Sequence, residues 1–260
     1  MKKLFTFLAL TISFSMNAQM SDNSANNNFA TESNAVAMGY GTTASGAEST
    51  AMGRSTTASG SRSTAMGYYT TADGTASTAM GSVTNATGNY STALGSTTNA
   101  SGNYSTASGS SSTASGDYST AMGQNTTASG SSSTASGSSS TASGAVTTAM
   151  GYGTSASGNF STSMGVNTTA SGSYSTAMGY YTTASGSVST AMGGYTTASD
   201  YASTVIGQYN SSGDSVTNSA NSFSTSNTAF VIGNGADSSN KSDAFKVMFN
   251  GDTTVSNDLT

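Results

Sequence analysis

Glycine recurs at every seventh position through most of the chain, and this spacing constrains the fold more than any other feature. The run extends from Gly39 to Gly193 without a slip and contains 23 glycines. Asp200 takes the next position, and Gly207 resumes the register. Two residues before each of these positions the residue is nearly always Ala. A period this strict predicts a repeat architecture in which successive units fold alike.

The true repeat is fourteen residues long, because the residue before glycine alternates in character. Residues 49–53 read Ser-Thr-Ala-Met-Gly, and residues 56–60 read Thr-Thr-Ala-Ser-Gly. One half of the repeat therefore has an apolar residue, usually Met, before its glycine, and the other half has a polar one, usually Ser. Thirteen positions of the Met type can be counted. We therefore expect about thirteen coils, each made of two similar halves.

A seven-residue period also occurs in coiled coils, but this composition excludes one. A glycine in every heptad would cost a helix roughly 1 kcal/mol each, and Ser and Thr add to that cost. The repeat instead suits short extended segments separated by tight turns, for which glycine supplies permissive dihedral angles. Two strands and two turns per repeat predict an all-β fold, a parallel β-roll or solenoid of about thirteen 14-residue coils.

Alternation along each strand separates its side chains into two rows. Ala and the Ser or Thr two residues before it occupy one row in both halves, so we expect this row to face the shared interior. The other row is apolar in one sheet and polar in the other. An outward apolar row needs a cover, and we expect copies of the same chain to provide it. The alternative is that these residues point inward as core. The expected self-association surface consists of Met38, Met52, Met66, Met80, Leu94, Met122, Met150, Met164, Met178, Met192 and Ile206.

All 13 tyrosines lie one or two residues after a glycine position, in the expected turns. Turn residues are exposed and free to diverge, so these rings are candidates for contact with glycans or proteins. They can instead stack on one another and stabilise the stack of coils, which is the interpretation that we favour. The candidates for surface contact are Tyr68, Tyr69, Tyr90, Tyr104, Tyr118, Tyr174, Tyr180 and Tyr181.

Composition excludes several function classes. The chain has no Cys and no His, and its net charge is −5. It therefore lacks disulfides, thiolate metal sites and the commonest catalytic base, and it lacks the clustered basic residues that nucleic-acid binding requires. We expect no enzyme, no catalytic residue and no cofactor. Asp237, Asp243 and Asp252 are possible Ca²⁺ ligands, but their spacing matches no EF-hand, so solvated turns and no metal site are expected.

The two ends of the chain differ from the repeats. Lys2 and Lys3, a short apolar run and Ala18 have the order of a secretory signal peptide. We expect a signal peptide at 1–18, a linker at 19–33, repeats at 34–208 and a non-repeating β-rich segment at 209–260. No later segment is apolar enough to be a transmembrane helix.

The paired motifs resemble the head of YadA-like trimeric autotransporter adhesins, also known for haemagglutinin-type repeats. The resemblance rests on Ser-Thr-Ala-Met-Gly alternating with Thr-Thr-Ala-Ser-Gly, as in residues 49–60 and 175–186. It implies a left-handed parallel β-roll, a homotrimer, and adhesion to host or matrix glycoproteins or other surfaces. It also implies that the protein is secreted or held at the cell surface, associated with the outer membrane of a Gram-negative bacterium. Met replaces the Ile, Val or Leu usual in that family.

Two other functions fit the same pattern. The polar half carries a regular Thr-x-Ser ladder, such as Thr43 with Ser45, whose hydroxyls could match an ice lattice. Asp73, Asn85, Thr87 and Asn99 interrupt that ladder. The repeats could also be a passive spacer in a larger fibre.

Overall fold

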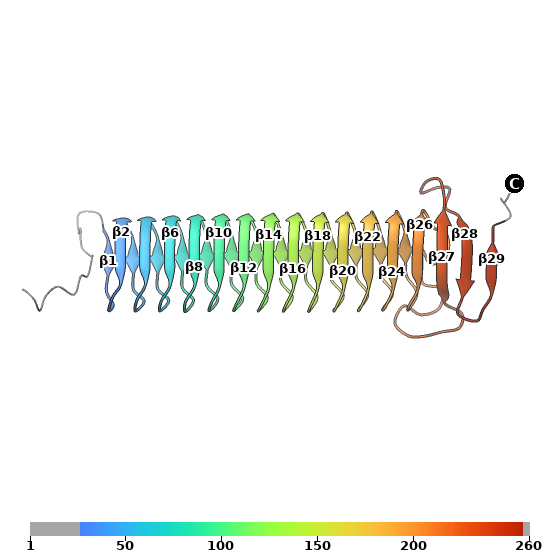
Figure 1. The fold of residues 1–260 in the computed structure, drawn as a ribbon, viewed down its shortest axis with the longest axis horizontal. Helices are drawn as coiled ribbons and strands as arrows, with labels where there is room; N and C mark the ends of the chain where they lie inside the picture. Colours follow the sequence, from blue (N-terminus) through green and yellow to red (C-terminus); the bar gives the residue numbers. More distant parts are fainter. Residues whose placement is uncertain (1–26, 257–260) are drawn as a thin grey trace, which may run out of the picture. The chain divides into compact units, whose positions relative to one another are not determined.

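The computed structural model describes residues 27–256 of the chain, and every regular element in that stretch is a β-strand (Figure 1). The described residues form two compact units, 27–111 and 112–256. Within the described stretch no helix has the length and apolar character needed to cross a bilayer. The expected signal peptide at 1–18 lies outside the described residues.

Each coil of the first unit contains a two-residue short strand and a five-residue long strand. The short strands are β1 (Phe29–Ala30), β3 (Thr43–Ala44), β5 (Thr57–Ala58), β7 (Thr71–Ala72), β9 (Asn85–Ala86) and β11 (Asn99–Ala100). The long strands are β2 (Val36–Tyr40), β4 (Thr50–Arg54), β6 (Thr64–Tyr68), β8 (Thr78–Ser82), β10 (Thr92–Ser96) and β12 (Thr106–Ser110). The first short strand lies inside the 19–33 segment for which the sequence predicted a linker.

The second unit repeats this pattern and adds three strands at its end. Its short strands are β13 (Thr113–Ala114), β15 (Thr127–Ala128), β17 (Thr141–Ala142), β19 (Ser155–Ala156), β21 (Thr169–Ala170), β23 (Thr183–Ala184) and β25 (Thr197–Ala198). Its long strands are β14 (Thr120–Gln124), β16 (Thr134–Ser138), β18 (Thr148–Tyr152), β20 (Thr162–Val166), β22 (Thr176–Tyr180), β24 (Thr190–Gly194) and β26 (Thr204–Gln208). The added strands are β27 (Thr228–Asn234), β28 (Asp243–Met248) and β29 (Thr253–Val255).

Both kinds of strand pair in parallel with the equivalent strand fourteen residues away, so like residues face like residues. In the first unit Met52 pairs with Met66, and in the second Met164 pairs with Met178. The backbone hydrogen bonds run between coils: the Thr57 N–H donates to the Thr70 carbonyl oxygen at 2.8 Å. The fold is therefore a parallel β-solenoid. Its thirteen short strands and thirteen long strands in the repeats correspond to the thirteen coils predicted from the sequence.

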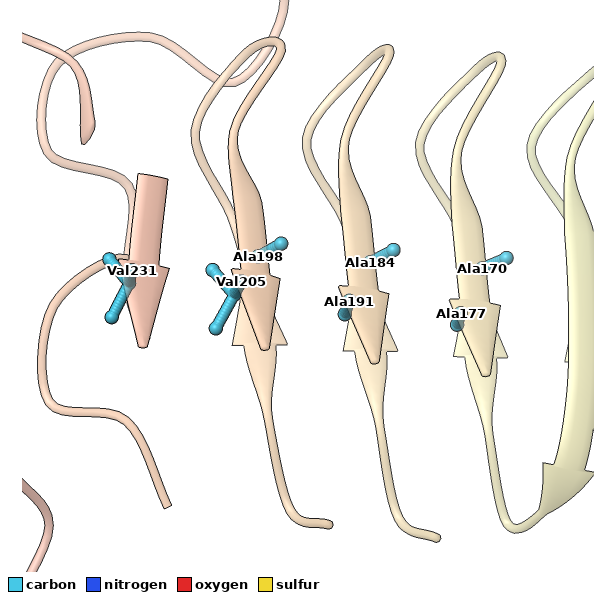
Figure 2. Close-up of a cluster of buried hydrophobic side chains, with 7 residues drawn as sticks. All are labelled: Ala170, Ala177, Ala184, Ala191, Ala198, Val205 and Val231. Atoms are coloured by element: carbon cyan, nitrogen blue, oxygen red, sulfur yellow. The ribbon is translucent and has the colours of Figure 1, made fainter. Parts of the chain in front are cut away.

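The interior is narrow and is filled by small side chains from both sheets. The Ala residues of long and short strands are buried, as are the residues two places before them, which are mostly Ser or Thr. This confirms the row expected to face inward. Figure 2 shows one cluster, in which Ala170, Ala184 and Ala198 of the short strands share the interior with Ala177, Ala191 and Val205 of the long strands, and with Val231.

The permissive dihedral angles predicted for glycine are used in the Met-type half of the repeat, within the long strands, while close contact between coils requires glycine in both halves. Gly151 lies inside β18 with φ +131, and a Cβ added there would meet the carbonyl oxygen of Gly165 at 2.0 Å. Gly158, which follows Ser157 in the polar half of the repeat, has no positive φ. A Cβ added there would still lie 2.1 Å from the Gly172 carbonyl oxygen. The left-handed turn residue instead comes two places after glycine, as at Phe160 with φ 58. Glycine is required because the backbone of the next coil leaves no room for a side chain.

Asp200 closes the repeats at the glycine position where the run is first broken. Its buried carboxylate accepts hydrogen bonds from the Thr217 N–H at 2.6 Å and the Thr228 N–H at 2.8 Å. Nearby, the Asn210 carboxamide accepts from the Thr197 N–H at 2.8 Å and donates to the Thr197 carbonyl oxygen at 2.9 Å. Side chains thus supply the partners that a further coil would have offered, which protects the edge of the short-strand sheet.

We predict that Asp200→Ala destabilises the second unit by about 2–4 kcal/mol, because two buried backbone N–H groups lose their acceptor. Denaturant unfolding of the purified protein measures this loss. The matched variant Asp73→Ala, which removes an exposed carboxylate, should change stability by less than about 0.5 kcal/mol. Equal effects of the two variants would contradict the closing role of Asp200.

Candidate functional site

In each unit the outer face of the long strands carries the predicted apolar residues in a row, and we call these residues together the Met row. Met38, Met80, Met122 and Met150 are exposed, at 37% to 44% of their surface, and the others are half-buried. Because Ala fills the interior, the Met side chains point outward rather than into the core. The row contains Met38, Met52, Met66, Met80 and Leu94 in the first unit, and Met122, Met150, Met164, Met178, Met192 and Ile206 in the second. Ser108 and Ser136 occupy the two polar gaps.

The apolar face continues onto the strands after the last coil, which the sequence analysis missed. Strand β27 pairs in parallel with β26, so that Ile206 faces Ile232. Strand β28 then pairs antiparallel with β27, which sets Phe245 beside Ile232 and Val247 beside Phe230. The rings of Phe230 and Phe245 lie 6.2 Å apart in an edge-to-face arrangement. The segment Val231-Ile232-Gly233 repeats Val205-Ile206-Gly207, and that similarity was the available clue.

The opposite face, built on the short strands, is polar. In the second unit the first residue of each short strand is a half-buried Thr or Ser. The residue two places later is a Ser, and most of these serines are exposed. No Asp, Glu, Lys, Arg or His occurs between Asp117 and Asp200. In the first unit Asp73 is exposed and accepts a hydrogen bond from the Ser59 hydroxyl. The two outer faces of each unit therefore differ in polarity, as the sequence predicted.

The turn aromatics adopt a backbone conformation that is unfavourable for large side chains. Tyr181, Tyr195 and Tyr209 have φ values of 52, 53 and 42, in a region that costs roughly 1–2 kcal/mol per residue. Each N–H donates to the preceding coil, for example Tyr195 to the Tyr180 carbonyl oxygen at 2.8 Å. Stacking between parallel rings contributes about 0.5–1.5 kcal/mol per pair. Hydrogen bonds and stacking together offset the strain of the turns.

One aromatic group of four tyrosines lies at the turns after β22, β24 and β26. The rings of Tyr181 and Tyr195 stack at 5.1 Å, and those of Tyr195 and Tyr209 at 4.5 Å, each pair within 9° of parallel. We call these three residues the tyrosine ladder. Tyr180 contacts both Tyr181 and Tyr195 edge-on. A hydrogen bond with the Tyr195 side chain raises the pKa of Tyr180 above that of a free tyrosine.

Other predicted contact tyrosines also lie against aromatic neighbours. Tyr90 stacks on Tyr104 at 4.9 Å, and Tyr174 stacks on Phe160 at 4.8 Å. Tyr68 meets Tyr69 edge-on at 4.5 Å, and the Arg54 guanidinium lies 5.7 Å from the Tyr68 ring centre. Tyr118 is 62% exposed. In each stacked pair one ring covers a face of the other, which favours stabilisation of the coils over stacking on a flat ligand.

The three carboxylates considered as Ca²⁺ ligands, Asp237, Asp243 and Asp252, each accept hydrogen bonds from a different set of residues. Asp243 accepts from Ser211 and Ser212, and Asp252 accepts from the Asn250 side chain at 2.7 Å. Asp237 accepts from the Asn240 side chain and from two backbone N–H groups, which lower its pKa. Within residues 27–256 no three acidic side chains converge as a metal site would require.

A parallel solenoid with one apolar and one polar outer face defines the class of this protein. The sequence model of a protein family, the YadA head domain repeat, matches the chain in ten segments. Together these segments cover residues 30–126, 128–182 and 184–210. The chain therefore belongs to the YadA head family. Among curated proteins, no sequence matches the chain.

The family consists of adhesive heads of trimeric autotransporter adhesins, which are non-enzymatic domains displayed on bacterial cell surfaces. This agrees with the resemblance drawn from the paired motifs at 49–60 and 175–186. The repeat region of the chain is thus an adhesin-type β-roll.

Proposed function

We propose that the protein is a secreted or surface-displayed adhesive head that acts as a homotrimer and attaches a Gram-negative bacterium to host or matrix glycoproteins. The observation that carries this proposal is the Met row, whose outward methionines lie on one face of each unit. Contiguous apolar surface exposed to water is unfavourable and marks an interaction site. Three copies that face one another through this row would bury it and leave the polar face outward.

The distribution of polar residues agrees with such an arrangement. In the second unit the short-strand face presents hydroxyls on successive coils. A trimer would present three such faces, so weak contacts at each coil would add through multivalency. The family's left-handed coil and its trimeric state support the same arrangement.

Light scattering on the purified protein tests the assembly. We expect a mass three times that of the chain, and a stable, folded monomer would contradict the proposal. Binding to immobilised matrix glycoproteins tests adhesion. Deletion of one complete coil, residues 127–140, preserves the register and should weaken binding if the coils make the contacts. Unchanged binding after the deletion would instead indicate a passive spacer.

One observation favours ice binding as a second candidate. The residues that interrupt the hydroxyl ladder, Asp73, Asn85, Thr87 and Asn99, all lie in the first unit, whereas in the second unit the ladder is continuous from Thr113 to Ser185. An uninterrupted array of equivalent hydroxyls is the arrangement that an ice surface would require. Thermal hysteresis of the purified protein distinguishes the two functions, since an adhesin should produce none.

A further inference from the structure

The tyrosine ladder places three phenol rings from successive coils in stacked contact. Tyr181, Tyr195 and Tyr209 occupy equivalent turn positions, and their ring centres are separated by 5.1 Å and 4.5 Å. The rings are also open to solvent: Tyr181 is 44% exposed and Tyr195 is 38% exposed. Tyr180 also contacts Tyr181 and Tyr195, so four phenols meet at these turns.

The composition directs one-electron oxidation toward these rings. The chain contains neither Trp nor Cys, the side chains that compete with tyrosine for loss of a single electron. Methionine reacts mainly by two-electron transfer of oxygen to its sulfur. A phenoxyl radical formed on one ladder ring therefore has another phenol, rather than a different electron donor, as its stacked neighbour.

We propose that the tyrosine ladder is an oxidative modification site at which a haem peroxidase and hydrogen peroxide join neighbouring coils by dityrosine bonds. Each of two phenols loses one electron and its hydroxyl proton. The two radicals form a bond between ring carbons ortho to the oxygens, the Cε atoms. The hydrogens on those carbons then move to the oxygens and restore both phenols. The pair loses two hydrogen atoms in total, and one hydrogen peroxide is reduced to two waters.

The geometry favours coupling within one chain. The reacting carbons lie at the ring edges, so stacked rings need only tilt to bring two Cε atoms together. Backbone hydrogen bonds hold the turns of adjacent coils together. The Tyr195 N–H donates to the Tyr180 carbonyl oxygen, and the Tyr209 N–H donates to the Gly194 carbonyl oxygen. A Tyr181–Tyr195 bond ties the coil of β22 to that of β24, a Tyr195–Tyr209 bond ties the coil of β24 to that of β26, and either restricts unfolding. This inference depends on neither adhesion nor trimer formation.

The methionines provide a direct assay of the bond. Cyanogen bromide cleaves after Met178, Met192 and Met248, which separates Tyr181 in fragment 179–192 from Tyr195 and Tyr209 in fragment 193–248. The whole protein is treated with peroxidase and hydrogen peroxide, any methionine sulfoxide is reduced, and the fragments are weighed. We expect the two fragments to be joined, with dityrosine fluorescence, while the chain still migrates as a single chain on a denaturing gel.

The sequence also supplies an internal control. Phe160 and Tyr174 stack at 4.8 Å and 5°, but phenylalanine lacks a phenol, so this stack should not join fragments 151–164 and 165–178. The variant Tyr195→Phe keeps the stacked ring and should abolish the joining of 179–192 to 193–248, whereas Tyr174→Phe should leave it unchanged. Circular dichroism verifies that both variants fold. Joined fragments that persist in Tyr195→Phe, cross-links mainly between chains, or no dityrosine at all would overturn the proposal.

Discussion

Replacement of Gly193 by Ala is expected to destabilise the second unit by roughly 3–5 kcal/mol, although it adds a single methyl group. A Cβ at this position would lie 2.0 Å from the carbonyl oxygen of Gly207 and 3.0 Å from its carbonyl carbon. Both atoms belong to the backbone of the next coil, so no side chain can move aside. The φ of +121 is also one that alanine rarely adopts. Coil separation would break the hydrogen bonds between β24 and β26.

The neighbouring residue supplies the matched control for that experiment. Gly194 lies in the same strand, yet a Cβ there would meet no atom within 4 Å. Gly194→Ala should therefore leave stability unchanged or slightly higher, because alanine restricts the unfolded chain. Chemical denaturation of the two variants in parallel measures the difference. Similar midpoints would mean that the close approach of the coils does not determine where glycine is needed.

The repeat itself could be predicted from the sequence. The glycine period, the inward Ala row and the outward Met row all follow from side-chain alternation, which is a local property of a strand. The reason for glycine could not be predicted in the same way. The clash at Gly151 involves Gly165 in the next coil, so it depends on how closely coils stack, and a seven-residue pattern does not encode that distance.

The strands after the last coil were harder to place for a related reason. Residue Ile206 pairs with Ile232, a step of 26 residues instead of fourteen. The intervening segment contains Gly213, whose carbonyl oxygen accepts from the Ser199 N–H at 2.9 Å, and Thr217, which donates to Asp200. These contacts link residues without any periodic relation, so periodicity could neither assign the role of Asp200 nor extend the apolar face to Phe230 and Phe245.

The Met row gives the second large effect. We predict that Met178→Asp combined with Met192→Asp weakens self-association by roughly a thousandfold or more, about 4 kcal/mol, because like charges would meet in a desolvated interface. Met178 and Met192 face each other in adjacent strands on the outer face of the long-strand sheet. Since neither side chain enters the Ala-lined interior, the coils themselves should remain folded. Analytical ultracentrifugation should then detect monomers with an unchanged circular dichroism spectrum.

A control on the opposite face distinguishes this effect from a general effect of charge. Thr169→Asp with Thr183→Asp adds the same two charges to adjacent short strands, β21 and β23, whose outer face is polar. That variant should assemble as the unchanged protein does. If both double variants assemble equally well, the Met row is not the self-association surface. If only the variant with altered methionines dissociates, the difference between the two halves of the 14-residue repeat determines which face is covered.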